Sequence, residues 1–194
     1  MPLDSIITYK DAFFTLDYSL WYLLALSLFI CLFSRTGNNR HSRKIKSARK
    51  ALNIFRSISE PAKKFSYIRK VNPFVFEEMI LTSLKDSGCK ITRNNRYTGD
   101  GGVDGRAVIR GTSVLIQAKR YRGHISANDI TEFSILCGKS RKQGLFVHTG
   151  KTGKQAKLNS IDCRIDIVSG NRMIALLDGS YSGLWEHRGC INTR

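Results

Sequence analysis

Acidic residues are scarce in this sequence, and the cysteines lack any recognisable spacing. The 194 residues include only 15 Asp and Glu against 32 Lys and Arg, which gives a net charge of +17. An excess of this size is more than solubility requires and suits a polyanionic partner, either nucleic acid or anionic lipid. The five cysteines form an odd set without CxxC spacing, which argues against a disulfide framework and a zinc site and fits a reducing cytosol.

Internal repeats and low-complexity tracts are also missing. With 42% apolar residues, a chain of this length can bury one sizeable core but has little room for two independent domains. We therefore expect one globular domain with appendages.

Charge divides the chain into three parts. Residues 1–34 contain three Asp and one Lys, residues 35–72 contain twelve Lys and Arg and one Glu, and the rest of the positive excess lies beyond residue 72. This division and the apolar segment described next predict a short non-cytoplasmic N-terminus at 1–17, an apolar segment at 18–34 and a basic linker at 35–71. The bounds expected for the globular domain, 72–179, and for the tail, 180–194, follow from the family resemblance given below.

The uncharged segment 18–34 reads YSLWYLLALSLFICLFS. As a helix with about 1.5 Å per residue it would be roughly 26 Å long, near the lower limit for crossing a bilayer. Aromatic residues mark its start, and Lys and Arg between positions 35 and 46 follow its end, which favours a transmembrane helix with the C-terminal part in the cytoplasm. A cleavable signal peptide is the alternative, but the preceding flank is acidic and no small-x-small cleavage site follows. We expect a single-pass anchor in the inner membrane.

The basic segment 43–58 repeats apolar residues at helical spacing. The stripe consists of Ile45, Ala48, Leu52 and Phe55, with Lys and Arg on the opposite face. Such a helix could lie on DNA or on an anionic membrane, where each basic residue contributes on the order of 1 kcal/mol. A solvated linker helix fits the pattern equally well, so both interpretations stay open.

A helix is predicted from Asn72, because Asn caps free amide groups and Pro73 fits the first helical position. Gly88 ends it. Four apolar residues at helical spacing form its expected buried stripe: Phe76, Met79, Ile80 and Leu84. Glu77 lies at the edge of this stripe, where it can face a cleft, although by itself it is more simply a surface charge.

A strand at 89–93, a glycine-rich turn at 99–102 and the segments VDGRAVI and TSVLIQAK predict a β-hairpin. If Arg110 and Gly111 form a two-residue loop, Asp104 pairs opposite Gln117 on one face of the sheet. Lys119 points the same way. Arg-Gly is not the preferred pair for such a loop, and a slip by one residue would reverse the faces.

These three side chains have a chemical rationale. Phosphodiester hydrolysis needs a hard cation that neutralises the phosphate and lowers the pKa of an attacking water. Asp104 would bind this cation, the Gln117 amide oxygen would be a neutral ligand, and Lys119 would orient the water or stabilise developing charge. From spacing alone, an ordinary hairpin with one exposed Asp and one exposed Lys is the simpler interpretation.

Three motifs together resemble the Mrr family of PD-(D/E)xK nucleases: Phe76-Glu77, the turn GDGGVDG at 99–105, and Gln117-Ala118-Lys119. The downstream order is also similar, with a helix start at 126–129, a strand at 144–147, a helix containing Ala156 and a strand at 164–168. The resemblance covers about residues 72–179. It implies an α/β fold of the restriction-endonuclease type, in which helices flank a mixed β-sheet.

By this resemblance Asp104 is the metal-binding aspartate and Lys119 is the catalytic lysine. Gln117 stands where most relatives have Glu, and Glu77 is the auxiliary helix acid. Mg²⁺ or Mn²⁺ would be held by Asp104, Gln117 and the backbone carbonyl of Ala118. Asp100 is a weaker candidate. Similar family members carry the same Gln, so its lower charge does not indicate inactivation.

The function implied is a membrane-anchored, Mg²⁺-dependent DNA endonuclease that restricts foreign or modified DNA. The alternative is a non-catalytic, membrane-tethered protein that uses its basic surface to bind DNA. A homodimer stays open as its assembly.

Two further signals are weaker. Gly150-Lys151-Thr152 does not complete a P-loop, because the preceding Gly144 is one residue too far away, and no nucleotide cofactor is expected. Lys151 and Lys154, together with Arg120, are candidates for contacts with DNA phosphates, although a solvated loop explains the two lysines equally well. His148 has no partner in the sequence pattern and is more simply a structural histidine.

Overall fold

The computed structural model describes the backbone of residues 4–94, 102–162 and 164–180, and the side chains of these residues except 4–18, 33–41 and 161–162. The chain divides into two compact units, residues 1–43 and residues 44–194. The first helix, α1 (Asp4–Ser57), contributes to both.

In the first unit, the described side chains of α1 at 19–32 are all exposed and mostly apolar. Among the residues described, no helix is long and apolar enough to cross a membrane. The expected span 18–34 includes Tyr18, Phe33 and Ser34, whose side chains lie outside the described residues. The membrane anchor stays a prediction.

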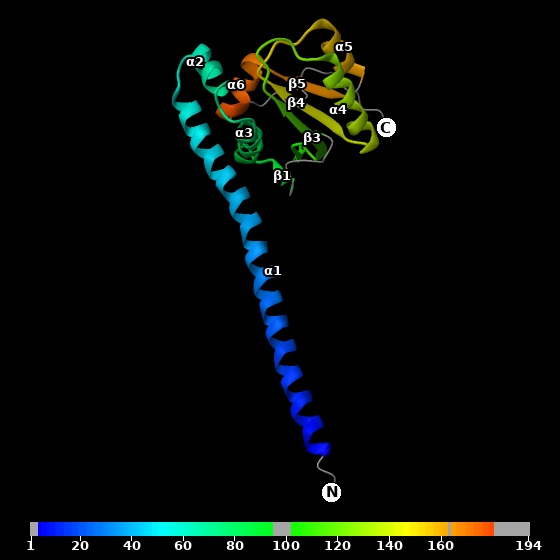
Figure 1. Cartoon of the computed structure of the whole chain (residues 1–194). Helices are drawn as coiled ribbons and strands as arrows, with labels where there is room; N and C mark the ends of the chain where they lie inside the picture. Colours follow the sequence, from blue (N-terminus) through cyan, green and yellow to red (C-terminus); the bar gives the residue numbers. More distant parts are fainter. Residues whose placement is uncertain (1–3, 95–101, 163, 181–194) are drawn as a thin grey trace. The chain divides into compact units, whose positions relative to one another are not determined.

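The second unit is built on a mixed five-stranded sheet with the strand order β1-β2-β3-β4-β5 (Figure 1). Its strands are β1 (Lys90–Arg93), β2 (Gly105–Ile109), β3 (Thr112–Lys119), β4 (Gln143–His148) and β5 (Ile165–Val168). The first three strands are antiparallel, and β3, β4 and β5 are parallel. The mixed α/β fold predicted from the sequence is confirmed.

The β2–β3 hairpin has the predicted register, in which Ile109 pairs with Thr112 and Gly105 with Ile116. Arg110 and Gly111 form the two-residue loop with φ values of 49° and 79°, as a type I′ turn requires. An L-residue in this region costs roughly 1 kcal/mol, which the flanking strand pairs offset. This register places Asp104, just before β2, level with Gln117.

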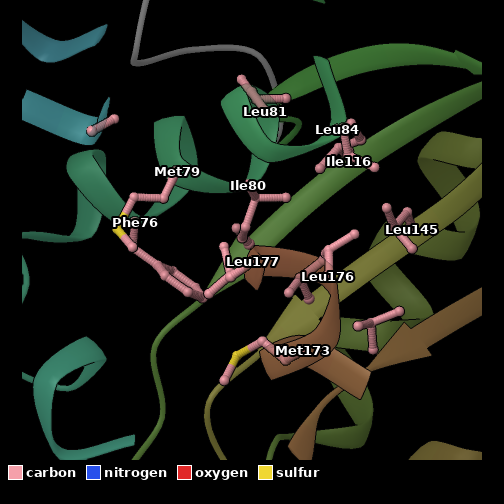
Figure 2. Close-up of a cluster of buried hydrophobic side chains, with 14 of the residues drawn as sticks. Phe76, Met79, Ile80, Leu81, Leu84, Ile116, Leu145, Met173, Leu176 and Leu177 are labelled. Atoms are coloured by element: carbon pink, nitrogen blue, oxygen red, sulfur yellow. The ribbon is translucent and has the colours of Figure 1, made fainter. Parts of the chain in front are cut away.

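Besides the end of α1, the described residues form five helices around the sheet: α2 (Pro61–Ile68), α3 (Pro73–Asp86), α4 (Ala127–Lys139), α5 (Lys154–Asp162) and α6 (Gly170–Asp178). Helices α3 and α6 cover one face of the sheet, and α4 and α5 cover the other (Figure 1). Successive residues of β3 alternate between the two cores, so that Ile116 packs with α3 and α6 while Leu115 packs with Phe133 of α4. Figure 2 shows how α3, β3, β4 and α6 meet in the first core.

Local signals at the helix starts are confirmed. The Asn72 side chain accepts a hydrogen bond from the Phe74 backbone N–H at 3.0 Å, and the stripe expected on α3 is at most 1% exposed. Ser126 caps α4 in the same way, by accepting from the Asn128 N–H at 3.2 Å. Gly88 follows α3 with a φ of 87°. These starts depend on neighbouring residues only, which is why the sequence predicts them.

The apolar stripe of segment 43–58 was expected to lie on lipid, on DNA or in solvent, and this expectation is wrong. Ala48, Leu52 and Phe55 are at most 1% exposed and belong to the core that α3 and α6 share. The Arg56 side chain also reaches α6, where its Nε donates to the Leu177 carbonyl at 2.9 Å. The end of α1 is therefore an integral layer of the domain.

The expected linker also contains α2, whose Lys64 is buried and forms a 2.6 Å ion pair with Asp178 at the end of α6. The Lys64 ammonium also lies over the face of the Phe55 ring, 4.7 Å from the ring centre. These contacts hold α2 against the same core.

Candidate active site

Asp104 is fixed at the open end of the hairpin by two hydrogen bonds to β3. Its backbone N–H donates to the Ile116 carbonyl at 2.8 Å, and its Oδ2 accepts from the Ala118 N–H at 2.7 Å. The side chain is largely enclosed, and burial raises its pKa to about 6, although the Ala118 N–H and the Lys119 ammonium act in the opposite direction. This carboxylate is therefore held in an orientation set by the sheet.

Gln117 lies on β3 level with Asp104 and is only 6% exposed. Its Oε1 is buried and has no hydrogen-bond partner among the residues that the structure describes. An unpaired buried acceptor costs about 1–3 kcal/mol, so this oxygen is suited to a ligand.

Gly102 packs its backbone against the Gln117 amide. A Cβ at position 102 would lie 2.5 Å from Gln117 Nε2, and the φ of Gly102 is 91°. The positive φ favours glycine there, and any side chain at this position would push the Gln117 amide out of its place.

Glu77 reaches the site from α3 and is half-buried. The pKa of Glu77 is raised to about 8, mainly by burial and also by the Asp104 and Glu78 carboxylates, while Lys44 acts in the opposite direction. Two carboxylates in such surroundings do not ionise together easily without a cation.

These side chains line a cleft of about 340 Å³ at the end of β3. Its walls consist of Pro73, Glu77, Gly102, Asp104, Gln117, Ala118, Lys119, Arg120 and Tyr121. The structure thus brings together the residues that the sequence predicted for the catalytic and metal sites. Their chemical roles stay predictions.

Lys119 has a partner that the sequence did not reveal. Its Nζ lies 2.5 Å from Oδ1 of Asp129, in the first turn of α4, and the Tyr121 hydroxyl donates to Oδ2 of the same carboxylate. The sequence predicts Asp129 only as part of a helix start. The available signal was an acid in the first turn of the helix that directly follows the lysine's strand.

A model of the Mrr_cat family, described as restriction endonuclease, matches residues 68–177, more than half of the chain. The chain belongs to this family. The Mrr_cat match begins at the end of α2, includes all five strands, and contains Glu77, Asp104, Gln117 and Lys119.

Solved structures with a similar fold include two restriction enzymes. MspJI, in complex with a 27-mer oligonucleotide, is 23% identical with a TM-score of 0.48, over 62% of this chain and 31% of MspJI. AspBHI, a DNA modification-dependent restriction endonuclease, is 21% identical with a TM-score of 0.38, over 70% of this chain and 36% of AspBHI. The match therefore spans about a third of the length of each enzyme. No curated protein matches the sequence.

The donor set of the Mrr_cat site fits a hard cation. No group of three or more His, Cys, Asp or Glu side chains that could hold a metal occurs within the described residues. Asp104 and Glu77 nevertheless supply two carboxylates, and Gln117 supplies an unpaired amide oxygen. Oxygen ligands of this kind suit Mg²⁺ or Mn²⁺. Asp100 lies outside the described residues.

The three candidates for contacts with DNA phosphates do not all lie at the cleft. Arg120 lines the cleft, where its Nη1 donates to the Arg69 carbonyl at 2.7 Å and its buried Nε has no partner among the described residues. Lys151 and Lys154 are exposed and are not among the residues that line the cleft. A role in DNA binding stays a prediction for all three.

His148 is buried and hydrogen-bonded within its own loop. Its Nδ1 accepts from the Gly150 N–H at 3.1 Å, so the neutral ring carries its proton on Nε2, which lies 3.0 Å from Thr152 Oγ1. Burial lowers the pKa of His148 to about 4. These contacts favour the structural interpretation of this residue.

Proposed function

We propose that this Mrr_cat chain is a metal-dependent deoxyribonuclease that hydrolyses phosphodiester bonds in foreign or modified DNA. One observation carries the proposal: Asp104, Gln117 and Lys119 converge on one cleft, where the Gln117 Oε1 is buried and unpaired among the described residues. An ordinary hairpin would have no reason to bury an unpaired amide oxygen beside an aspartate.

Asp104, Glu77 and Gln117 would hold the cation, with the Ala118 backbone carbonyl as a further candidate ligand. A bound Mg²⁺ or Mn²⁺ would neutralise phosphate charge and activate a water. Lys119 lines the same cleft and its side chain is partly exposed, so its ammonium could donate a hydrogen bond to a phosphate oxygen as negative charge develops there. Arg120 at the cleft and the overall charge of +17 would bind the DNA backbone.

The proposal includes an anchor in the inner membrane, with the nuclease domain in the cytoplasm. Residues 19–32 of α1 are exposed on every side, and large apolar side chains such as Trp21, Leu24 and Phe29 are more than half exposed. A helix that is apolar all round favours lipid or protein surroundings over water. The Lys and Arg that follow the apolar segment support the cytoplasmic orientation of the domain.

The test uses the full chain in detergent with supercoiled plasmid, methylated and unmethylated, and with Mg²⁺, Mn²⁺ or EDTA. We expect nicked or linear plasmid with either metal and none with EDTA. A mobility shift without cleavage under all conditions would instead support the non-catalytic DNA-binding alternative, which the strong positive charge also favours.

A further inference from the structure

The Lys119 side chain ends in an ion pair that crosses from the sheet to a helix. Its Nζ lies 2.5 Å from Asp129 Oδ1, and the side chains are 34% and 16% exposed. The residues are ten positions apart, with Lys119 at the end of β3 and Asp129 in the first turn of α4. An ammonium has three N–H donors, so this contact leaves two for other partners.

Asp129 is itself held in place from two sides. Its second oxygen, Oδ2, accepts from the Tyr121 hydroxyl, and the Ser126 backbone N–H donates to its carboxylate. The Ser126 side chain also accepts from the Asn128 N–H, so the start of α4 resembles a capping box in which the serine bonds the second helical residue instead of the third. The carboxylate therefore has little rotational freedom.

Tyr121 is fixed in turn by the residue that follows β4. Its backbone N–H donates to Thr149 Oγ1 at 3.0 Å, and this hydroxyl donates to the Tyr121 carbonyl at 2.8 Å. Thr149 is only 1% exposed. A continuous set of hydrogen bonds thus runs from the end of β4 through Tyr121 and Asp129 to the Lys119 ammonium.

The charge of Asp129 is preserved by the same contacts. Burial acts to raise its pKa, but the hydrogen bonds from Lys119 and Tyr121 outweigh this effect and hold the pKa below its usual value. Asp129 is accordingly ionised at neutral pH and attracts the ammonium.

We propose that Asp129, supported by Tyr121, is a positioning residue that holds the Lys119 ammonium at the cleft for phosphodiester hydrolysis. This inference rests on the proposed nuclease function. Lysine has a flexible four-carbon side chain with about 2 kcal/mol of rotamer entropy, and an anchored ammonium avoids much of that loss during the reaction. Asp129 therefore affects the cleavage step and has little influence on DNA binding.

The test compares single-turnover cleavage by the full chain with its DNA dissociation constant measured without metal. Asp129→Ala is expected to slow cleavage by about 10- to 100-fold, because a displaced catalytic group costs about this much, while the dissociation constant stays within about twofold. Asp129→Asn keeps an oxygen that can accept from Lys119 and should retain more of the rate. Tyr121→Phe, which loosens Asp129 without removing it, should cost less than Asp129→Ala.

Glu132 offers a matched control, since it is an exposed acid on the same helix. Glu132→Ala removes the same charge from α4 and should leave the cleavage rate unchanged. Thermal unfolding of each variant shows whether it folds. If Asp129→Ala does not fold, the cleavage rates of Asp129→Asn and Tyr121→Phe replace it in the test, and both should lie below the rate of the parent. Rates equal to that of the parent would overturn the inference.

A double-mutant cycle separates positioning from a merely structural role. With enzyme in excess over labelled DNA, Asp129→Ala should cause little further loss in a Lys119→Ala background, because its effect acts through the lysine. Full additivity, or equal losses in cleavage and DNA affinity, would overturn the inference. Equal cleavage rates for the parent and Asp129→Ala would also overturn the inference, but they would leave the proposed nuclease function intact. A parent that does not cut DNA overturns both.

Discussion

The Glu77 carboxylate on α3 lies close enough to the Asp104 carboxylate beside β2 for the negative charge of Asp104 to raise the pKa of Glu77. The two residues come from a helix and a hairpin and meet at one cleft. Two acids that resist joint ionisation gain most from a divalent cation, which neutralises both.

Mg²⁺ binding should consequently depend on pH. The pKa of Asp104 is about 6 and that of Glu77 about 8, so both protons must leave before the two carboxylates can bind a cation. The Mg²⁺ concentration for half-maximal cleavage is expected to fall as pH rises from 6 to 8. Glu77→Gln should flatten this dependence above about pH 7. A Mg²⁺ requirement that is the same across this range would contradict the proposed pairing of the two acids.

Asp104 and Lys119 should be essential for cleavage and dispensable for DNA binding. Asp104→Ala removes a carboxylate that the sheet holds at the cleft, and we expect cleavage to fall by roughly 10³-fold or more. Lys119→Ala should have a similar effect, while filter binding detects near-normal affinity because most of the positive charge remains. If both variants cut plasmid as well as the parent does, the catalytic site lies elsewhere.

Gln117→Glu tests the neutral ligand. The change places a carboxylate where Oε1 is buried and unpaired among the described residues, and it keeps the length of the side chain. Activity should persist and the Mg²⁺ concentration for half-maximal cleavage should decrease, since carboxylates bind this ion more strongly than amides. Gln117→Leu, which removes the oxygen, is the control and should lose cleavage.

Sequence alone predicts the parts of this site that depend on local geometry. The two-residue loop at Arg110 and Gly111 sets the register of the hairpin, and the register places Asp104 level with Gln117. The cap at Asn72 sets where α3 begins, which determines the position of Glu77 along the helix. Such features depend on a few neighbouring residues.

Contacts between elements could not be predicted in the same way. The periodicity of Ala48, Leu52 and Phe55 shows that one helix face is apolar, but it does not reveal that α3 and α6 cover that face. Likewise, the ion pair of Lys119 with Asp129 arises only when α4 packs beside β3. A single sequence contains the partners but not the packing that brings them together.

The membrane anchor makes a prediction about the intact chain. If the apolar segment of α1 spans the inner membrane, the full chain should sediment with membranes and resist extraction by high salt and alkaline carbonate. Its C-terminus should be protected from protease added outside spheroplasts, because the Lys and Arg that follow the segment orient it. A matched variant with Leu24→Lys and Phe29→Lys should shift the chain to the soluble fraction. Recovery of the intact parent in the soluble fraction would exclude the anchor.

His148 should make the stability of the domain depend on pH. Its pKa is about 4 in the folded protein and about 6.5 when unfolded, so the unfolded chain binds more protons between these values. The stabilisation from the neutral, buried ring is therefore complete above pH 6.5 and is lost as pH falls towards 4, by about 3 kcal/mol.

Urea unfolding of residues 44–194 at several pH values measures this loss, with His148→Gln as the control that cannot titrate. Asp104 and Glu77 contribute with the opposite sign, since burial raises their pKa, but they are common to both proteins and cancel in the difference. The free energy of unfolding of the parent should therefore fall relative to that of His148→Gln as pH decreases, and parallel curves would show that His148 is not held neutral by its surroundings.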